Sequence, residues 1–308
     1  MENQHVRNSV AGSIAADKIE LLGVDLLQRN RLRAADLRSF AASLRLDFGW
    51  HYLLDINWIL EQLGTVSGCR IMDAGAGTGV IQWYLAQQGA QVVSVDRGSR
   101  ALLPSRFRRR FNVLGLRPQD LRPQGQVFSE ILRRPQGAGQ KAGALRRELL
   151  GLWGGSASPG SVAIYNQDLA HLVDIPDNSL DAVVAVSALE HNSQEDLPGV
   201  VAELMRVLKP GGTLLASLNA ARDQDWWHEP SKGWCYTEPS LRRLFSLPMH
   251  APSNYAHYDE LFADLVGCAE LRDNLAAFYF RSGENGMPWG RWDPQYLPVG
   301  VCKVKQYS

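Results

Sequence analysis

The chain has 308 residues, of which 45% are hydrophobic and 21% charged, so it can bury a substantial core and is not disordered as a whole. Its formal net charge is zero, which argues against a protein held to nucleic acid by overall charge. No apolar run approaches the length of a membrane span, and the first residues lack a secretion signal, so we expect a cytoplasmic protein. Free thiols and no metal site are expected, because the spacing of the four cysteines fits no metal motif: Cys69, Cys235, Cys268 and Cys302.

Residues 1–65 are expected to form a helical N-terminal extension. The aromatic stretch 48–52 within it leaves two interpretations open. It forms part of a lid over a site, or it belongs to an apolar helix that packs on a sheet.

From residue 66 onward, strand and helix patterns alternate, and we assign 66–308 to one domain. Strands are expected at 69–74, 91–96, 161–165, 180–187 and 213–218, with helices at 80–88 and about 196–208. This alternation predicts an α/β fold with a doubly wound, mostly parallel, seven-stranded sheet that helices cover on both faces. Strand patterns at 275–282 and 297–304 predict a C-terminal antiparallel hairpin.

Residues 98–160 are interpreted as a basic insertion, because strand-like sequence resumes directly after them. The stretch 97–150 holds thirteen basic residues against three acidic ones, a net charge of +10. Repeated Arg-Pro-Gln and several glycines predict largely irregular structure, with possible helices at about 99–114 and 141–153. A solvated, mobile loop is the default interpretation, and the sharper alternative is a surface that attracts an anionic acceptor.

The most informative segment is Asp73-Ala74-Gly75-Ala76-Gly77-Thr78-Gly79, between an expected strand and an expected helix. Its glycines permit a tight turn and let a ligand approach the backbone. Asp96 ends the next strand, 23 residues after Asp73, where an acid of dinucleotide-binding folds accepts hydrogen bonds from ribose. The pairing predicts a cofactor site. Glycines that only make a turn, with an aspartate that only caps a helix, are the weaker alternative.

The segment from Asp73 to Gly79 resembles the first motif of class I, Rossmann-like S-adenosylmethionine-dependent methyltransferases. Three later segments resemble further motifs of the family in the same order: 166–169, 177–191 and 204–213. The resemblance spans about residues 66–220 apart from the insertion, which departs from the compact family pattern.

This resemblance implies methyl transfer with S-adenosyl-L-methionine as cofactor. It places glycines 75, 77 and 79 around the methionine part, Asp73 near the amino group, Asp96 at the ribose, and Asp168 and Leu169 at the adenine. The complete set of expected cofactor residues is Asp73, Gly75, Gly77, Gly79, Asp96, Arg97, Asp168, Leu169 and Ser187.

Transfer of a methyl group from a sulfonium is a direct displacement, which requires an aligned acceptor and the exclusion of water. A hydroxyl acceptor also gains from a base. His191, just after the expected fourth strand, is the first candidate base, and a role in ordering the site without proton transfer is equally open. His228 is the second candidate, in a tryptophan-rich segment that forms either an acceptor pocket or a small satellite core.

No motif of adenine, glutamine or cytosine methylation follows the fourth strand. We therefore expect methyl transfer to a hydroxyl, or next to an amine, of a small molecule such as a saccharide or secondary metabolite. This acceptor could be anionic or carrier-bound, and nucleic acid is not expected as a partner. Two other classes stay open: a nicotinamide-dependent oxidoreductase and a catalytically silent cofactor-binding module.

Overall fold

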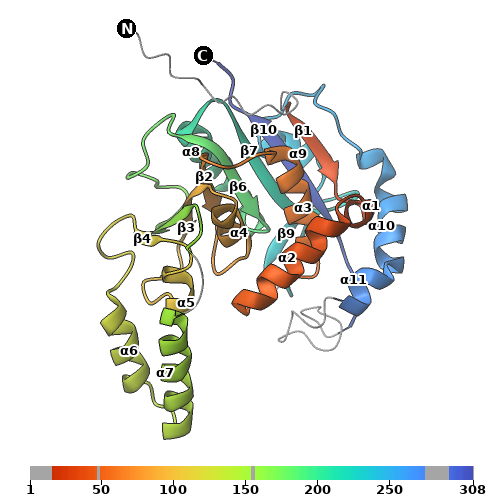
Figure 1. Cartoon of the computed structure of the whole chain (residues 1–308). Helices are drawn as coiled ribbons and strands as arrows, with labels where there is room; N and C mark the ends of the chain where they lie inside the picture. The colour runs from red at the N-terminus through yellow and green to blue at the C-terminus, as the bar shows by residue number, and fades with distance from the viewer. Residues whose placement is uncertain (1–15, 47–48, 154–156, 275–290, 308) are drawn as a thin grey trace.

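The fold is organised around one sheet, seen in a computed structural model that describes residues 16–46, 49–153, 157–274 and 291–307 (Figure 1). The strand order is β1-β10-β7-β6-β2-β3-β5-β4, with β9 beside β7 and β8 beside β9. The strands are β1 (Lys18–Leu21), β2 (Arg70–Ala74), β3 (Gln91–Asp96), β4 (Val113–Gly115), β5 (Ser161–Asn166), β6 (Leu180–Val186), β7 (Leu208–Ala220), β8 (Trp226–His228), β9 (Gly233–Tyr236) and β10 (Leu297–Val304).

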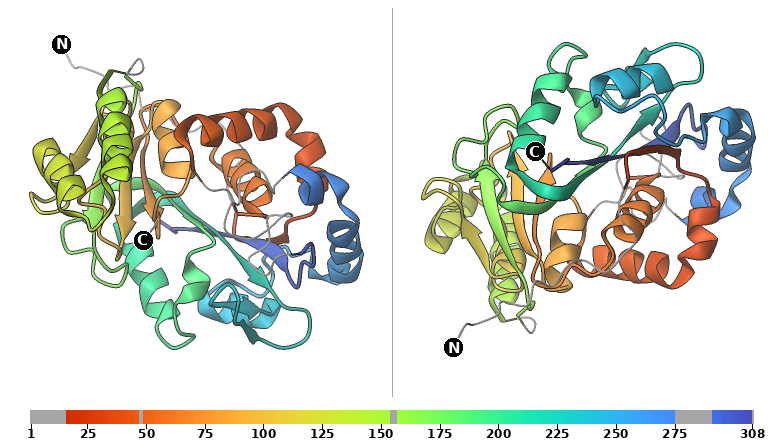
Figure 2. Two further views of the ribbon diagram at one scale, coloured as in Figure 1. Left: turned by 90° about the horizontal axis from the view of Figure 1, so that it is seen from below. Right: turned by 90° about the horizontal axis from the view of Figure 1, so that it is seen from above.

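The helices lie on both faces of this sheet. In Figure 2, α2, α3 and α4 lie on one face, and α8 and α9 lie on the other. None of the helices in the described part of the chain combines the length and the apolar character needed to cross a bilayer. The helices are α1 (Asp25–Arg29), α2 (Arg31–Leu44), α3 (Tyr52–Leu63), α4 (Ile81–Gln87), α5 (Ser105–Arg108), α6 (Gln124–Arg133), α7 (Ala138–Trp153), η1 (Leu189–His191), α8 (Leu197–Val207), α9 (Glu238–Leu244), η2 (Tyr255–His257), α10 (Tyr258–Gly267) and α11 (Ala269–Asn274).

The predicted α/β class is confirmed, with some differences in the sheet. Strands β4, β5, β3, β2, β6 and β7 pair in parallel, and β10 runs antiparallel to β7. Among the described residues the sheet has ten strands, where seven were expected. The expected hairpin strand at 275–282 lies outside the described residues, and the second neighbour of β10 is β1.

Strand β1 is a correction to the expectation that the N-terminal extension is helical. Its sequence, Lys-Ile-Glu-Leu, alternates partly buried and buried positions, which is the two-residue period of a strand. Because β1 extends the sheet beyond β10, the N-terminal segment belongs to the same sheet as the strands that follow residue 66.

The insertion is not largely irregular, so that expectation is wrong for its described part. It contains α5, β4, α6 and α7, and β4 extends the sheet beside β5. Pro104 and Pro123 stand immediately before α5 and α6, where a missing backbone N–H costs nothing, so these prolines begin helices. In Figure 1, α6 and α7 project from the β4 edge of the molecule.

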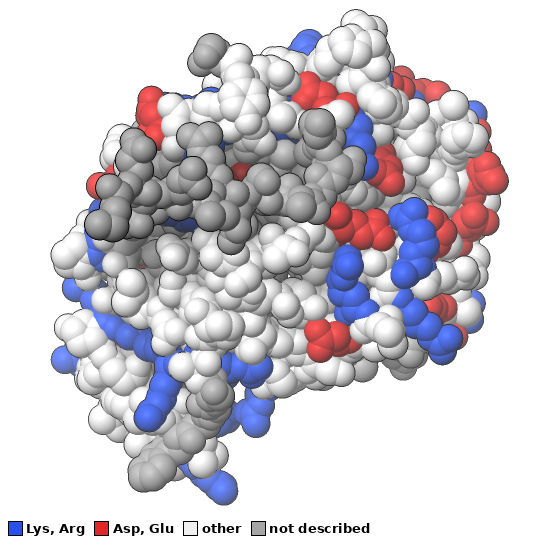
Figure 3. Space-filling model, turned by 45° about the horizontal axis from the view of Figure 1, so that its top comes forward, with Lys and Arg blue, Asp and Glu red and all other residues white. Residues whose placement is uncertain are grey.

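Several arginines of the insertion bind the insertion itself. Arg108 donates to the carbonyls of Leu103 and Ala101 at 2.6 and 3.0 Å. Arg117 pairs with Asp120, which is fully buried. Other basic side chains remain at the surface, and on the face in Figure 3 they gather at the lower left. Some of the basic residues behind the net charge of +10 therefore stabilise the insertion, and others are exposed at the surface.

Helix α3 packs closely on β10. Trp58 of α3 is fully buried, and its Nε1 donates to the Glu20 carboxylate of β1 at 2.9 Å. A methyl group at Gly300 of β10 would come within 2.5 Å of the Trp58 ring. The N-terminal helix is thus seated on the strand at a position that admits only glycine without movement.

We expect Gly300→Ala to lower the free energy of unfolding by about 1–3 kcal/mol, because the added methyl overpacks the contact with Trp58. Urea denaturation measures this. The control is Gly199→Ala in α8, where no atom lies within 4 Å of the added methyl. It should be neutral or stabilising by about 0.5–1 kcal/mol. Equal stability of the two variants would contradict the packing of α3 on β10.

Candidate functional site

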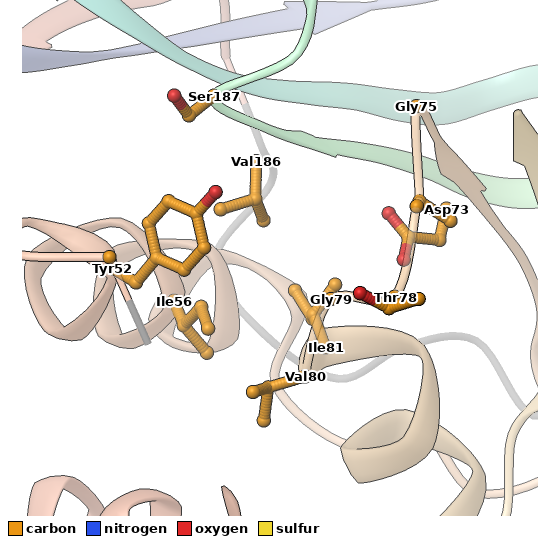
Figure 4. A pocket seen from close by; sticks show the side chains of 13 residues that line it. Tyr52, Ile56, Asp73, Gly75, Thr78, Gly79, Val80, Ile81, Val186 and Ser187 are labelled. Atoms are coloured by element: carbon orange, nitrogen blue, oxygen red, sulfur yellow. The ribbon is translucent and has the colours of Figure 1, made fainter. Parts of the chain in front are cut away.

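A cleft of about 350 Å³ lies at the carboxyl ends of β2 and β6. Such an edge of an open parallel sheet is where ligands bind in α/β folds. Figure 4 shows the glycine loop on one side and α3, with Tyr52 and Ile56, on the other. The lining residues are Gly49, Tyr52, Ile56, Asp73, Gly75, Ala76, Gly77, Thr78, Gly79, Val80, Ile81, Val186 and Ser187.

The loop after β2 needs glycine for two separate reasons. Gly75 and Gly77 have φ of +76° and +45°, in the left-handed region that favours glycine. A methyl at Gly75 would also lie 2.5 Å from the Ala188 side chain. The loop can therefore bend this sharply beside the end of β6 only without a side chain at position 75.

Two polar side chains hold the bend. The Asp96 carboxylate accepts hydrogen bonds from the N–H of Gly77 at 2.8 Å and of Gly98 at 2.6 Å. The Gln82 amide donates to the carbonyls of Ala76 and Gly79 at 3.2 and 3.1 Å. Sequence reasoning missed Gln82, although a glutamine among the apolar residues of α4 was a usable signal.

Sequence reasoning also missed Arg100, because it is one of twelve arginines in the basic stretch 97–150. It is 8% exposed, and its guanidinium donates to the carbonyls of Ser94 and Tyr165 at 2.7 and 3.2 Å. Its charge acts on both Asp73 and Asp96. Arg100 is therefore the internal cation of the cofactor end of the sheet.

Asp73 lies at the floor of the cleft and is 2% exposed. Its Oδ2 is buried and has no hydrogen-bond partner within the described ranges. Burial raises the pKa of Asp73 to about 7, with Arg100 opposing the shift and Asp96 adding to it. A cationic group of a bound ligand would stabilise the ionised form of this buried carboxyl group.

The remaining predicted cofactor residues follow the same sheet edge outside the cleft lining. Asp96 of β3 lies opposite Asn166 of β5. Beyond these strand ends, the exposed Arg97 lies 3.9 Å from Asp168, from Nη1 to Oδ2. Leu169 packs against the core. The structure thus brings Asp73, the three glycines and Ser187 into the lining and sets the other four along the rim.

Ser187 joins the cleft to a buried acid. It has a φ of +45°, a conformation that costs energy for a residue with a side chain. Its hydroxyl donates to Oε1 of Glu190 at 2.5 Å. Glu190 is fully buried, and burial raises the pKa of its carboxyl.

The two histidines predicted as bases lie outside the cleft lining. Nδ1 of His191, which is exposed, is 2.7 Å from the carbonyl oxygen of Lys232, so it donates and ties η1 to the loop before β9. His228 is 1% exposed, and its Nδ1 lies 2.6 Å from the Ser231 hydroxyl. Burial lowers the pKa of His228. Both catalytic assignments remain predictions.

The tryptophan-rich segment forms the hairpin β8–β9, and β9 pairs in parallel with β7. Trp226 packs against the core, whereas Trp227 is 39% exposed and contacts Trp234 with ring centroids 5.7 Å apart. The segment therefore contributes both to a small core and to the surface.

An open parallel sheet with a glycine bend after one strand and an acid ending the next defines a Rossmann-like cofactor-binding protein. The family model of the methyltransferase domain matches residues 144–216, which include β5, β6 and α8. This match supports the resemblance to class I S-adenosylmethionine-dependent methyltransferases, a class whose cofactor is S-adenosyl-L-methionine.

Similar proteins match over short segments. A ubiquinone biosynthesis O-methyltransferase of Leptothrix cholodnii is 39% identical over 49 residues, 16% of this chain and 21% of the relative. One of Acinetobacter baumannii is 36% identical over 54 residues, 18% and 23% of the two chains. The alignments span about a fifth of the length of these relatives.

Solved structures match over most of the chain with low identity. A Burkholderia thailandensis 1,6-didemethyltoxoflavin-N1-methyltransferase has a TM-score of 0.44 and 12% identity, covering 91% of this chain and 90% of its own. The [4+2]-cyclase SpnF has a TM-score of 0.47 and 15% identity, covering 95% and 100%.

We expect Gly75→Ala to abolish measurable binding of S-adenosylhomocysteine in calorimetry, because the methyl must displace either the loop or Ala188. Gly125→Ala, in α6 and with nothing within 4 Å of the new methyl, is the matched control and should bind as the wild type does. Retained binding in Gly75→Ala would show that the loop does not border the ligand.

The affinity for S-adenosylhomocysteine should rise about tenfold between about pH 6 and pH 8, because its ammonium group favours the ionised form of Asp73. Asp73 has a pKa of about 7, so below that value the ligand must first displace a proton. Calorimetry across this range measures the slope. Asp73→Asn should bind weakly and lose the slope, and a flat wild-type profile would contradict the role of Asp73.

Proposed function

We propose that the chain transfers a methyl group from S-adenosyl-L-methionine to a hydroxyl group of a small molecule. The observation that carries this proposal is the cleft itself, which has a bare glycine bend and the buried Asp73 on one side and α3 on the other.

The cofactor is proposed to lie along the strand ends. Its methionine part would sit against glycines 75, 77 and 79, with its ammonium group at Asp73. The ribose would reach Asp96, whose two oxygens have lone pairs beyond those used by Gly77 and Gly98. The adenine would lie toward Arg97, Asp168 and Leu169, and Ser187 would face the methyl group.

A hydroxyl acceptor is favoured over an amine by two observations. The relatives with the short matches are named O-methyltransferases. Buried side chains able to accept a hydroxyl proton also lie near the cleft: Glu190, which is hydrogen-bonded to Ser187, and His51, which is paired with Asp55. A saccharide or secondary metabolite is the acceptor class to screen first, including anionic and carrier-bound forms, because part of the basic insertion remains displayed.

The nicotinamide oxidoreductase and the silent binding module are separated from this proposal by one set of measurements. Mass spectrometry of acceptors incubated with methyl-labelled S-adenosylmethionine detects the transferred methyl group. Calorimetry compares S-adenosylhomocysteine with NAD⁺. Transfer supports the proposal, binding of S-adenosylhomocysteine without transfer supports a silent module, and a preference for NAD⁺ would overturn the cofactor assignment.

In the same calorimetry, we expect Asp96→Asn to weaken S-adenosylhomocysteine binding by about tenfold to a hundredfold, because hydrogen bonds to a charged group contribute about 1.5–3 kcal/mol. The substitution keeps the size of the side chain and removes its charge. Asp223→Asn, at an exposed surface acid, is the control and should bind normally. An unchanged affinity in Asp96→Asn would remove Asp96 from the cofactor site.

A further inference from the structure

The residue before α3 and the first turn of α3 form a histidine–aspartate pair that the sequence did not reveal. Nδ1 of His51 lies 2.6 Å from Oδ2 of Asp55, one helical turn later. His51 is 5% exposed and Asp55 is fully buried. A carboxylate at this distance fixes the ring and its tautomer, because Nδ1 carries the proton and Nε2 keeps its lone pair.

The pair lies next to the cleft. Gly49 and Tyr52 both line the cleft, so His51 belongs to the segment that borders it. Glu190, which accepts the hydrogen bond of the cleft residue Ser187, is close enough for its charge to act on His51. His51 and Asp55 are not themselves lining residues, so the pair adjoins the cleft through Gly49 and Tyr52.

Beyond Ser187, buried polar atoms lack partners. Within the described ranges, Oε2 of Glu190 and both amide atoms of Asn219 are buried without a hydrogen bond. A methyl at Gly233 would lie 2.9 Å from Glu190 Cγ and 3.3 Å from Asn219 Nδ2, so these three residues lie together. Unpaired buried polar atoms are costly, and a bound polar ligand would satisfy them.

We propose that His51, held by Asp55, is the general base that takes the proton of the acceptor hydroxyl. The inference rests on the methyl transfer proposed above and deepens it, since the N-terminal helix then supplies a reacting group as well as a wall of the cleft. As the acceptor oxygen bonds to the methyl carbon, its proton passes to Nε2 of His51, and the electron pair of the broken carbon–sulfur bond stays on sulfur. The proton then leaves to solvent.

The charges around His51 suit this role. Burial opposes protonation of the ring, but Asp55 and, to a smaller extent, Glu190 outweigh burial, so the pKa of His51 is raised above its usual value. Burial also raises the pKa of both acids, and the hydrogen bond of Asp55 to His51 favours the ionised form of Asp55. Two tyrosines also lie against the ring, Tyr52 with ring centroids 5.4 Å apart and Tyr296 at 5.9 Å. Burial keeps the pKa of Tyr296 well above its usual value. The imidazolium formed in the reaction would thus be stabilised by two acids.

The test compares three histidines in the full chain. His51→Gln should lower kcat by about a hundredfold or more, since general bases contribute about 10²–10⁴-fold. His250→Gln, at an exposed position, is the matched control, and His191→Gln tests the rival base. Phenol, catechol, a methyl hexoside and benzylamine serve as acceptor probes with labelled S-adenosylmethionine. Calorimetry with S-adenosylhomocysteine and thermal melting establish that each variant is folded and binds cofactor.

A second variant separates proton transfer from structure. Asp55→Asn keeps the size of the side chain and removes the charge that favours the imidazolium, so the acidic limb of the kcat profile should move to lower pH. NMR titration of the labelled His51 ring should show the same direction of change without any acceptor present.

Each outcome has one meaning. Loss of kcat in His51→Gln with intact cofactor binding, together with the shifted limb in Asp55→Asn, supports the inference. Near-normal kcat in His51→Gln overturns it, and a loss confined to His191→Gln moves the base to that residue. Methyl transfer to benzylamine and to none of the hydroxyl probes also overturns it, because an amine that arrives neutral needs no base. Failure of the wild type to bind S-adenosylhomocysteine would instead defeat the proposed function.

Discussion

The whole cofactor end of the sheet depends on how the bend after β2 is held. Glycines make the bend possible, but their conformational freedom would by itself leave the loop without a fixed conformation. Asp96 fixes its N–H side through Gly77, and Gln82 fixes its carbonyl side through Ala76 and Gly79. Ser94 links the two, because its hydroxyl donates to Gln82 at 2.6 Å. The loop is therefore preorganised, and binding of a ligand costs little conformational entropy there.

The bend can be used only because a second surface faces it, and that surface comes from the N-terminal segment. Strand β1 pairs with β10, and α3 sits on β10 through Trp58 and Gly300. These contacts place Tyr52 and Ile56 opposite the glycine loop (Figure 4). One wall of the cleft therefore comes from a helix that is held in place by β10, so the stability of this packing and the shape of the cleft are linked.

The sequence predicted what is periodic and local. Strand β3 was expected with its observed ends, and the bend and Asp96 were found from spacing. What it missed depends on distant partners. The fit of β1 beside β10 joins residues almost 300 positions apart, and no local pattern specifies it. Gln82, Arg100 and the His51–Asp55 pair are polar residues that gain meaning only once burial is known, because an exposed and a buried polar side chain look alike in sequence.

The buried charges at the end of the sheet distinguish Asp73 from the other acids near it. Arg100 is the buried cation here, and its charge is shared among Asp73, Asp96 and Asp120. Asp96 and Asp120 also accept backbone N–H groups, from Gly77 and Arg117 among others, so their carboxylates are stabilised locally. Burial raises the pKa of Asp73 to about 7, and one of its buried oxygens has no hydrogen-bond partner among the described residues. Of these three acids only Asp73 is among the residues that line the cleft, so it is the one that a cationic ligand group entering the cleft would meet.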